Sequence, residues 1–77
     1  MKEQVLDLLA EATGSDEVKD NLDLNLFEEG LMDSLAMVQF LVDVEAELGI
    51  SVPVSEVQRE DWDTPNKIIN QLENYQG

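Results

Sequence analysis

The 77-residue chain contains no cysteine and no histidine, and only four of its residues are basic. Without cysteine no disulfide can form, and without either residue type we expect no structural metal site. Imidazole and thiol groups are also the usual means of activating a nucleophile, and both are absent. We therefore expect that the protein is not an enzyme and that any chemistry on it is performed by another protein.

Positively charged side chains are also few in this chain. Eighteen acidic residues against four basic ones give a formal net charge of -14. Such a charge repels phosphate backbones, so it excludes nucleic acid as a partner, and it attracts proteins with basic patches. The same charge repels itself, so we expect salt to stabilise the fold.

Long apolar runs are missing too. No stretch approaches the ~18 consecutive apolar residues of a membrane span, and the first residues, "MKEQVLDLLAEATG", are too acidic for a signal peptide. We expect a cytoplasmic protein. Because a second core could not be built from a chain of this length, residues 1–77 are expected to form a single domain.

Apolar spacing predicts a first helix in "EQVLDLLAEA", which Thr13, Gly14 and Ser15 end. From Asp16 to Gly30 the chain is polar apart from the alternating leucines of "LDLNLF". That alternation has the period of a strand, but no other segment offers a pairing partner. We therefore predict a long first loop that is anchored by its leucines.

The longest helical pattern is "DSLAMVQFLVDVEAELG", with Asp33 or Ser34 as its N-cap and Gly49 as its stop. Pro53 and the S-x-x-Q of Ser55 and Gln58 then indicate a loop and a short capped helix. Thr64 followed by Pro65 predicts the start of a last helix, because proline at the first helical position loses no hydrogen bond. The buried side of that helix is expected to comprise Ile68, Ile69, Leu72 and Tyr75. The predicted fold class is all-α, a small bundle of three principal helices plus one short helix, with a long first loop.

The central helix has more apolar surface than one core face requires. Its main face is formed by Met37, Phe40, Leu41, Val44 and Leu48. Leu35, Val38 and Val42 form a second apolar strip on another side, beside Ser34. The strip can pack inside the bundle, or it can be an exposed surface, rimmed by carboxylates, on which a partner docks.

Ser34 allows two interpretations. It can be an ordinary helix N-cap. It can also carry a phosphoester, because the free amides and partial positive charge of a helix N-terminus favour phosphate. In the second case the neighbouring Asp33 could help a modifying enzyme to hold magnesium during phosphoryl transfer.

At "FEEGLMDSL" the sequence resembles the carrier-protein family, whose members bear 4'-phosphopantetheine on the serine of a D-S-L motif. The resemblance covers nearly the whole chain, including its length and its acidic surface. It implies an acyl-carrier-protein-like bundle in which Ser34 carries the arm, covalently attached from coenzyme A by a phosphopantetheinyl transferase, with Asp33 assisting. The thiol of the arm would hold an acyl group as a thioester.

Two segments indicate the branch of the family. Fatty-acid carriers continue the motif with acidic residues where this chain has Ala36 and Gln39. The segment "VPVSEVQREDWDTPNKIINQL" is similar to carriers of D-alanine in the teichoic-acid D-alanylation of Gram-positive cell walls. Trp62 is its most distinctive residue, although its expected physical role is an aromatic plug that closes the bundle.

The resemblance implies a set of partners. A cytosolic D-alanine ligase would load the arm, and a membrane O-acyltransferase system would take the D-alanine towards lipoteichoic acid. For docking we expect apolar contact from Leu35, Val38 and Val42, and steering of basic partner surfaces by Glu28, Glu29 and Glu45. The carrier itself is expected to be a monomer.

Other functions remain open from the sequence. A carrier of fatty-acid, peptide or polyketide synthesis would share the serine motif, although peptidyl carriers usually sit within much longer chains. A different class is an unmodified acidic module that binds a partner through the same apolar strip. A calcium sensor is disfavoured, because "DLDLNLFEEG" lacks the ligand spacing and central glycine of an EF-hand loop.

Overall fold

The computed structural model describes residues 1–76 and contains four α-helices in that range. They are α1 (Lys2–Thr13), α2 (Glu17–Asp20), α3 (Ser34–Leu48) and α4 (Pro65–Gln76). Two 3-10 turns, η1 (Val54–Glu56) and η2 (Arg59–Asp61), lie between α3 and α4. No strand occurs within the described residues, so the predicted all-α fold class is confirmed. Gly77, the last residue of the predicted single domain, lies outside them.

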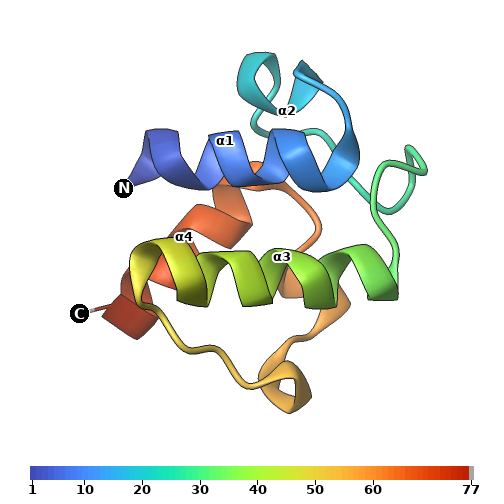
Figure 1. Cartoon of the computed structure of the whole chain (residues 1–77). Helices are drawn as coiled ribbons and strands as arrows, with labels where there is room; N and C mark the ends of the chain where they lie inside the picture. Colours follow the sequence, from blue (N-terminus) through green and yellow to red (C-terminus); the bar gives the residue numbers. More distant parts are fainter. Residues whose placement is uncertain (77) are drawn as a thin grey trace.

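Helices α1 and α3 lie side by side and run in opposite directions, with α4 behind them (Figure 1). The long loop after α2 leads to the start of α3, which lies near the C-terminal end of α1 (Figure 1). The segment with η1 and η2 runs below α3 in the same view. The long loop and the η1–η2 segment therefore both lie near the first turn of α3.

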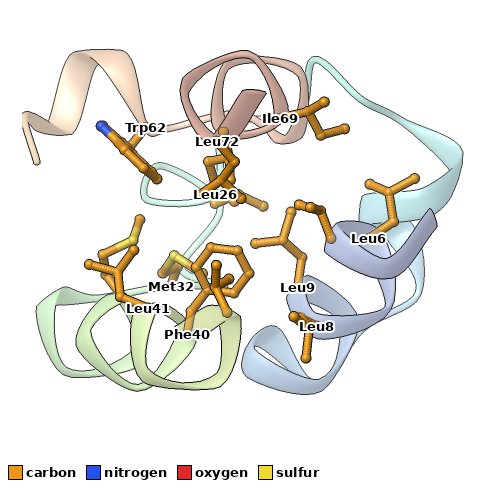
Figure 2. Close-up of a cluster of buried hydrophobic side chains, with 14 of the residues drawn as sticks. Leu6, Leu8, Leu9, Leu26, Met32, Phe40, Leu41, Trp62, Ile69 and Leu72 are labelled. Atoms are coloured by element: carbon orange, nitrogen blue, oxygen red, sulfur yellow. The ribbon is translucent and has the colours of Figure 1, made fainter. Parts of the chain in front are cut away.

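One apolar core joins the helices. Figure 2 shows Leu9 of α1, Phe40 of α3 and Leu72 of α4 pointing to a common centre, with Leu26 of the long loop between them. All four are fully buried, and every residue in the buried class within the described range is apolar. The stability of the bundle therefore rests on apolar packing, as a chain without disulfides requires.

Trp62 closes one end of this core. Its side chain is only 1% exposed, and its ring lies 6.5 Å from that of Tyr75 in α4. This packing agrees with the predicted plug. Tyr75 is predicted on the buried side of the last helix, but it is 37% exposed, and its hydroxyl donates a hydrogen bond to Glu56 of η1 at 3.3 Å.

The predicted helix ends are confirmed at three places. Gly14 and Gly49 end α1 and α3. Gly49 has a φ of 70°, a conformation that strains residues with a Cβ atom, and its amide donates to the Glu45 carbonyl. At the start of α4, the Thr64 hydroxyl accepts a hydrogen bond from the Lys67 amide at 3.2 Å, and Pro65 takes the first helical position.

The predicted short helix is misplaced. The S-x-x-Q at Ser55 predicted a capped helix, but Ser55 lies inside η1, and neither η1 nor η2 has a side-chain cap. The short α-helix is instead α2, within the segment predicted as loop. It buries Val18 and is held to α1 by an ion pair of 2.7 Å between Lys19 and Asp7. The hydrogen bond and charge of Asp7 raise the pKa of Lys19.

Candidate functional site

The chain reaches Ser34 through a tight turn built on Asn25. The Asn25 side-chain oxygen accepts hydrogen bonds from the amides of Phe27 and Glu28, at 3.1 and 2.9 Å, which starts the turn. Gly30 ends it with a φ of 70°. The amides of Leu31 and Met32 then both donate to the carbonyl of Leu26, at 2.9 and 3.1 Å.

This turn fixes the direction in which the chain enters α3. Leu26 and Met32 are both buried, so the backbone is anchored in the core on each side of Gly30. Asp33 follows in an extended conformation, and α3 begins at Ser34. The leucine anchoring predicted for the long loop is thus confirmed, with Leu26 as the deepest contact.

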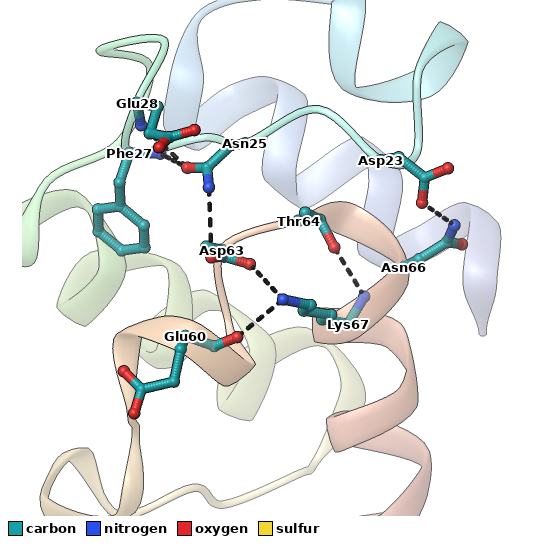
Figure 3. Close-up of polar contacts among 9 residues, drawn as sticks. All are labelled: Asp23, Asn25, Phe27, Glu28, Glu60, Asp63, Thr64, Asn66 and Lys67. Atoms are coloured by element: carbon teal, nitrogen blue, oxygen red, sulfur yellow. Dashed lines mark hydrogen bonds and ion pairs between the residues drawn. The ribbon is translucent and has the colours of Figure 1, made fainter.

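A set of polar contacts holds the turn against the start of α4 (Figure 3). The amide group of Asn25 donates to Asp63 Oδ2 at 3.3 Å, and the Leu26 amide donates to the Asp63 carbonyl at 2.7 Å. The buried Oδ1 of Asp63 has no hydrogen bond within the described residues, but the Lys67 ammonium lies 3.1 Å away and pairs with its charge. Lys67 also donates to the Glu60 carbonyl at 2.9 Å.

A second contact reinforces the first. The Asn66 side chain donates to the Asp23 carboxylate at 3.0 Å, and the Asn66 backbone N–H donates to the Leu22 carbonyl at the same distance. The two side-chain hydrogen bonds therefore join residues that lie 38 and 43 positions apart in the sequence. The entry to α3 is consequently set by the far end of the chain as well as by its own loop.

Asp33 caps α3. Its Oδ1 accepts a hydrogen bond from the Ala36 amide at 2.8 Å, and Ser34 occupies the first helical position. Of the two predicted caps, Asp33 is therefore the one used. The Ser34 side chain is exposed, and its hydroxyl makes no hydrogen bond to any residue of the described chain. A hydroxyl in this place is available to an enzyme that approaches the helix N-terminus.

An open groove of about 520 Å³ runs beside Ser34. One wall is formed by the first turns of α3, including Met37 and Val38, and the other by residues of the η1–η2 segment. The lining of this second wall and of the groove's end comprises Val54, Val57, Arg59 and Phe27. Arg59 places its guanidinium 4.7 Å from the centre of the Phe27 ring. The groove is thus mainly apolar, with one cation at its rim.

The second apolar strip of α3 is exposed. Leu35 is 79% exposed, Val42 55% and Val38 38%, so the strip does not pack inside the bundle. The three predicted steering residues are exposed as well. Glu28 and Glu29 lie in the turn before α3, while Glu45 lies about three helical turns further along it. The residues of the predicted docking face are therefore exposed, but Glu45 lies well away from Ser34 along α3.

Metal-binding and membrane-spanning features are both missing from residues 1–76. No group of three or more acidic side chains is placed to hold a metal ion there. None of the helices in that range has both the length and the apolar character needed to cross a membrane.

A family profile described as "Phosphopantetheine attachment site" matches residues 3–72. The chain belongs to this family. Its members bind 4'-phosphopantetheine, so the cofactor predicted from the sequence is confirmed. Membership of this family implies a carrier role.

Curated relatives cover almost the whole chain. A D-alanyl carrier protein of Lacticaseibacillus rhamnosus is 57% identical over 76 residues, which are 99% of this chain and 94% of the relative. One of Enterococcus faecalis is 58% identical over 73 residues, 95% and 94% of the two chains. One of Bacillus velezensis is 51% identical over 71 residues, 92% and 91%. The predicted resemblance to this branch of the phosphopantetheine-attachment family is therefore confirmed.

The residues at the start of α3 fit a phosphopantetheine arm. Ser34 offers an exposed hydroxyl next to a groove, and the N-terminus of α3 favours a negatively charged group. The sequence motif predicted Ser34 as the attachment point, but it gave no signal for the far wall of the groove. Phe27, Val54 and Arg59 come from two loops, and no periodic pattern in the sequence predicts that these loops meet.

Proposed function

We propose that this protein carries D-alanine as a thioester on 4'-phosphopantetheine attached to Ser34. The observation that carries the proposal is 57% identity over 76 residues with a protein named D-alanyl carrier protein. The exposure of Ser34 beside the groove supports the attachment point. When attached, the arm supplies a thiol, which the chain itself lacks.

The chain contributes the presentation of the serine. The buried Leu26 and Met32 fix the turn that precedes Ser34, so a transferase meets the hydroxyl in one position. Asp33 holds the first turn of α3 through the Ala36 amide. Its second carboxylate oxygen remains available to assist magnesium during the attachment step. The adjacent amides of the helix N-terminus favour the phosphate once it is attached.

The proposed partners are those of a D-alanine carrier. A phosphopantetheinyl transferase attaches the arm, a D-alanine ligase loads it, and a membrane O-acyltransferase system unloads it for teichoic-acid D-alanylation. The proposed carrier works in the cytoplasm as a monomer, has no enzymatic activity of its own, and forms one domain over residues 1–77.

The proposed docking face is formed by the apolar strip and the three glutamates. Leu35, Val38 and Val42 supply apolar area next to the attachment point, and their exposure supports this assignment. The carboxylates of Glu28, Glu29 and Glu45 attract basic surfaces and speed encounter without large effects on the bound state. All partners act on Ser34 or on the arm attached to it, so they compete for the same face.

A loading experiment tests the branch. The protein is first converted with coenzyme A and a phosphopantetheinyl transferase, and it is then offered either to a D-alanine ligase with ATP and D-alanine or to a fatty-acid transacylase with its acyl donor. We expect the mass of one D-alanyl group to be added by the ligase, and little or no transfer by the transacylase. Acylation by the transacylase alone would identify a fatty-acid carrier, which Ala36 and Gln39 disfavour.

A further inference from the structure

Arg59 is the single arginine of the chain, and it contacts an aromatic ring. Its guanidinium carbon lies 4.7 Å from the centre of the Phe27 ring, a cation–π distance. Within the described residues the two ion pairs belong to Lys19 and Lys67, so Arg59 pairs with no carboxylate there. It nevertheless lies beside Glu60 and Asp61 in η2.

The contact with Phe27 leaves the donors of the guanidinium available. Its five N–H groups make no side-chain hydrogen bond and no ion pair within the described residues. Phe27 is half-buried, which limits the motion of the ring beneath the cation. Arg59 is exposed and lines the same groove as Asp33 and Ser34. The ring thus holds a set of unused donors at the rim of the groove.

An anion attached to Ser34 would need such a cation. A phosphodiester adds one negative charge to a chain that already carries -14, next to the carboxylate of Asp33. The N-terminus of α3 offsets part of that repulsion. Arginine binds phosphate oxygens through two parallel N–H donors, a geometry that the point charge of lysine does not offer. The other cations of the chain do not line this groove.

We propose that Arg59, held by Phe27, binds the phosphodiester of the arm on Ser34 and so sets the direction in which the arm leaves α3. This inference rests on the proposed attachment at Ser34. Phe27 is the positioning residue in this arrangement, because it acts on the arm only through Arg59. The arm would then start along the groove between α3 and the η1–η2 segment.

The single arginine makes the test direct. Its side chain gives one Nε–Hε signal in a 1H–15N spectrum, which is recorded for the unmodified protein and again after conversion with coenzyme A and a transferase. Intact mass first establishes the conversion. We expect the Arg59 signal to move on conversion and its exchange with water to slow several-fold. No partner protein is present, so an arginine reserved for a partner's carboxylate would give the same signal in both forms.

Charge-matched variants complete the test. Arg59→Gln and Lys2→Gln each remove one positive charge, but Lys2 lies at the start of α1, away from the lining of the groove. In the converted proteins, we expect the 31P resonance to shift in Arg59→Gln and to keep its wild-type position in Lys2→Gln. Arg59→Lys is expected to restore the resonance only in part, and Phe27→Leu to shift it in the same direction as Arg59→Gln.

The outcomes separate this inference from the proposed function. If the wild-type chain gains no mass on incubation with coenzyme A and the transferase, both the attachment at Ser34 and the role of Arg59 are ruled out. A chain that gains the mass but keeps an unchanged Arg59 signal overturns the role of Arg59 alone. Identical 31P resonances in Arg59→Gln and Lys2→Gln would also overturn that role while leaving the attachment at Ser34 intact.

Discussion

The Asp33 carboxylate accepts a hydrogen bond from the Ala36 backbone amide at 2.8 Å, which satisfies one of the free donors at the start of α3. Because the aspartate performs this task, the adjacent serine does not have to. Ser34 keeps an exposed hydroxyl within the first helical turn. The D-S pair therefore divides two roles between neighbours: one residue stabilises the helix and the other is displayed.

Two substitutions of Asp33 separate its cap from its charge. Asparagine caps helices as well as aspartate does, whereas alanine does not, so Asp33→Ala is expected to lower the free energy of unfolding by about 1 kcal/mol and Asp33→Asn by much less. If the carboxylate assists magnesium, both variants slow arm attachment. Urea unfolding and transferase kinetics measure the two effects. A transferase rate for Asp33→Asn equal to that of the wild type would remove the second role.

The exposed strip is expected to affect docking but not folding. Leu35→Gln removes a side chain that is 79% exposed, so its effect on the free energy of unfolding should stay within about 0.5 kcal/mol. The KM of a D-alanine ligase for the carrier is expected to rise. The contrast is Met37→Ala on the same helix, where a side chain 4% exposed is truncated and about 2–5 kcal/mol is lost. Unchanged KM values in both Leu35→Gln and Val42→Gln would count against the docking face.

Asn25 is predicted to be a structural residue of the site although it lies away from Ser34 in sequence. Asn25→Ala removes the acceptor for the Phe27 and Glu28 amides and the donor to Asp63. Each lost hydrogen bond contributes about 0.5–1.5 kcal/mol, so a clear fall in stability is expected. Hydrogen exchange should show faster exchange at the amides of Leu31 and Met32. Protection equal to the wild type at those amides would show that the turn does not depend on Asn25.

Salt is expected to stabilise the protein. The net charge of -14 makes the acidic side chains repel one another in the compact state. At physiological ionic strength, added ions screen the repulsion between exposed charges that lie more than about 8 Å apart. The two ion pairs of the described residues are too few to reverse the trend. The melting temperature should therefore rise with sodium chloride concentration in calorimetry. A melting temperature that stays constant from low to high salt would contradict the role given to charge repulsion.

The three long helices could be predicted from the sequence because each carries a local signal. Apolar residues recur at helical spacing, Gly14 and Gly49 mark two ends, and Thr64 with Pro65 marks a beginning. These signals depend only on neighbours in the chain. The exposed strip could be located on a helical wheel, but whether it is buried depends on what packs over it, and only the structure answers that.

The loops were harder to predict, for a physical reason. Helix α2 has four residues and buries only Val18, so its sequence carries almost no periodicity. Ser55 presented a capping pattern, yet Pro53 and Val57 on either side are both extended, so only the three residues of η1 form a helical turn. The groove beside Ser34 depends on contacts between distant loops, such as Phe27 with Arg59. Contacts of this kind leave no pattern within either segment.

Attachment of the prosthetic arm to Ser34 underlies both proposals, and intact-protein mass is its sharpest test. Wild type, Ser34→Ala and Ser55→Ala are incubated with coenzyme A and a phosphopantetheinyl transferase, with Ser55 as a matched exposed serine of η1. We expect the mass of one phosphopantetheine on wild type and Ser55→Ala, and none on a folded Ser34→Ala. The same gain on folded Ser34→Ala would contradict attachment at this serine.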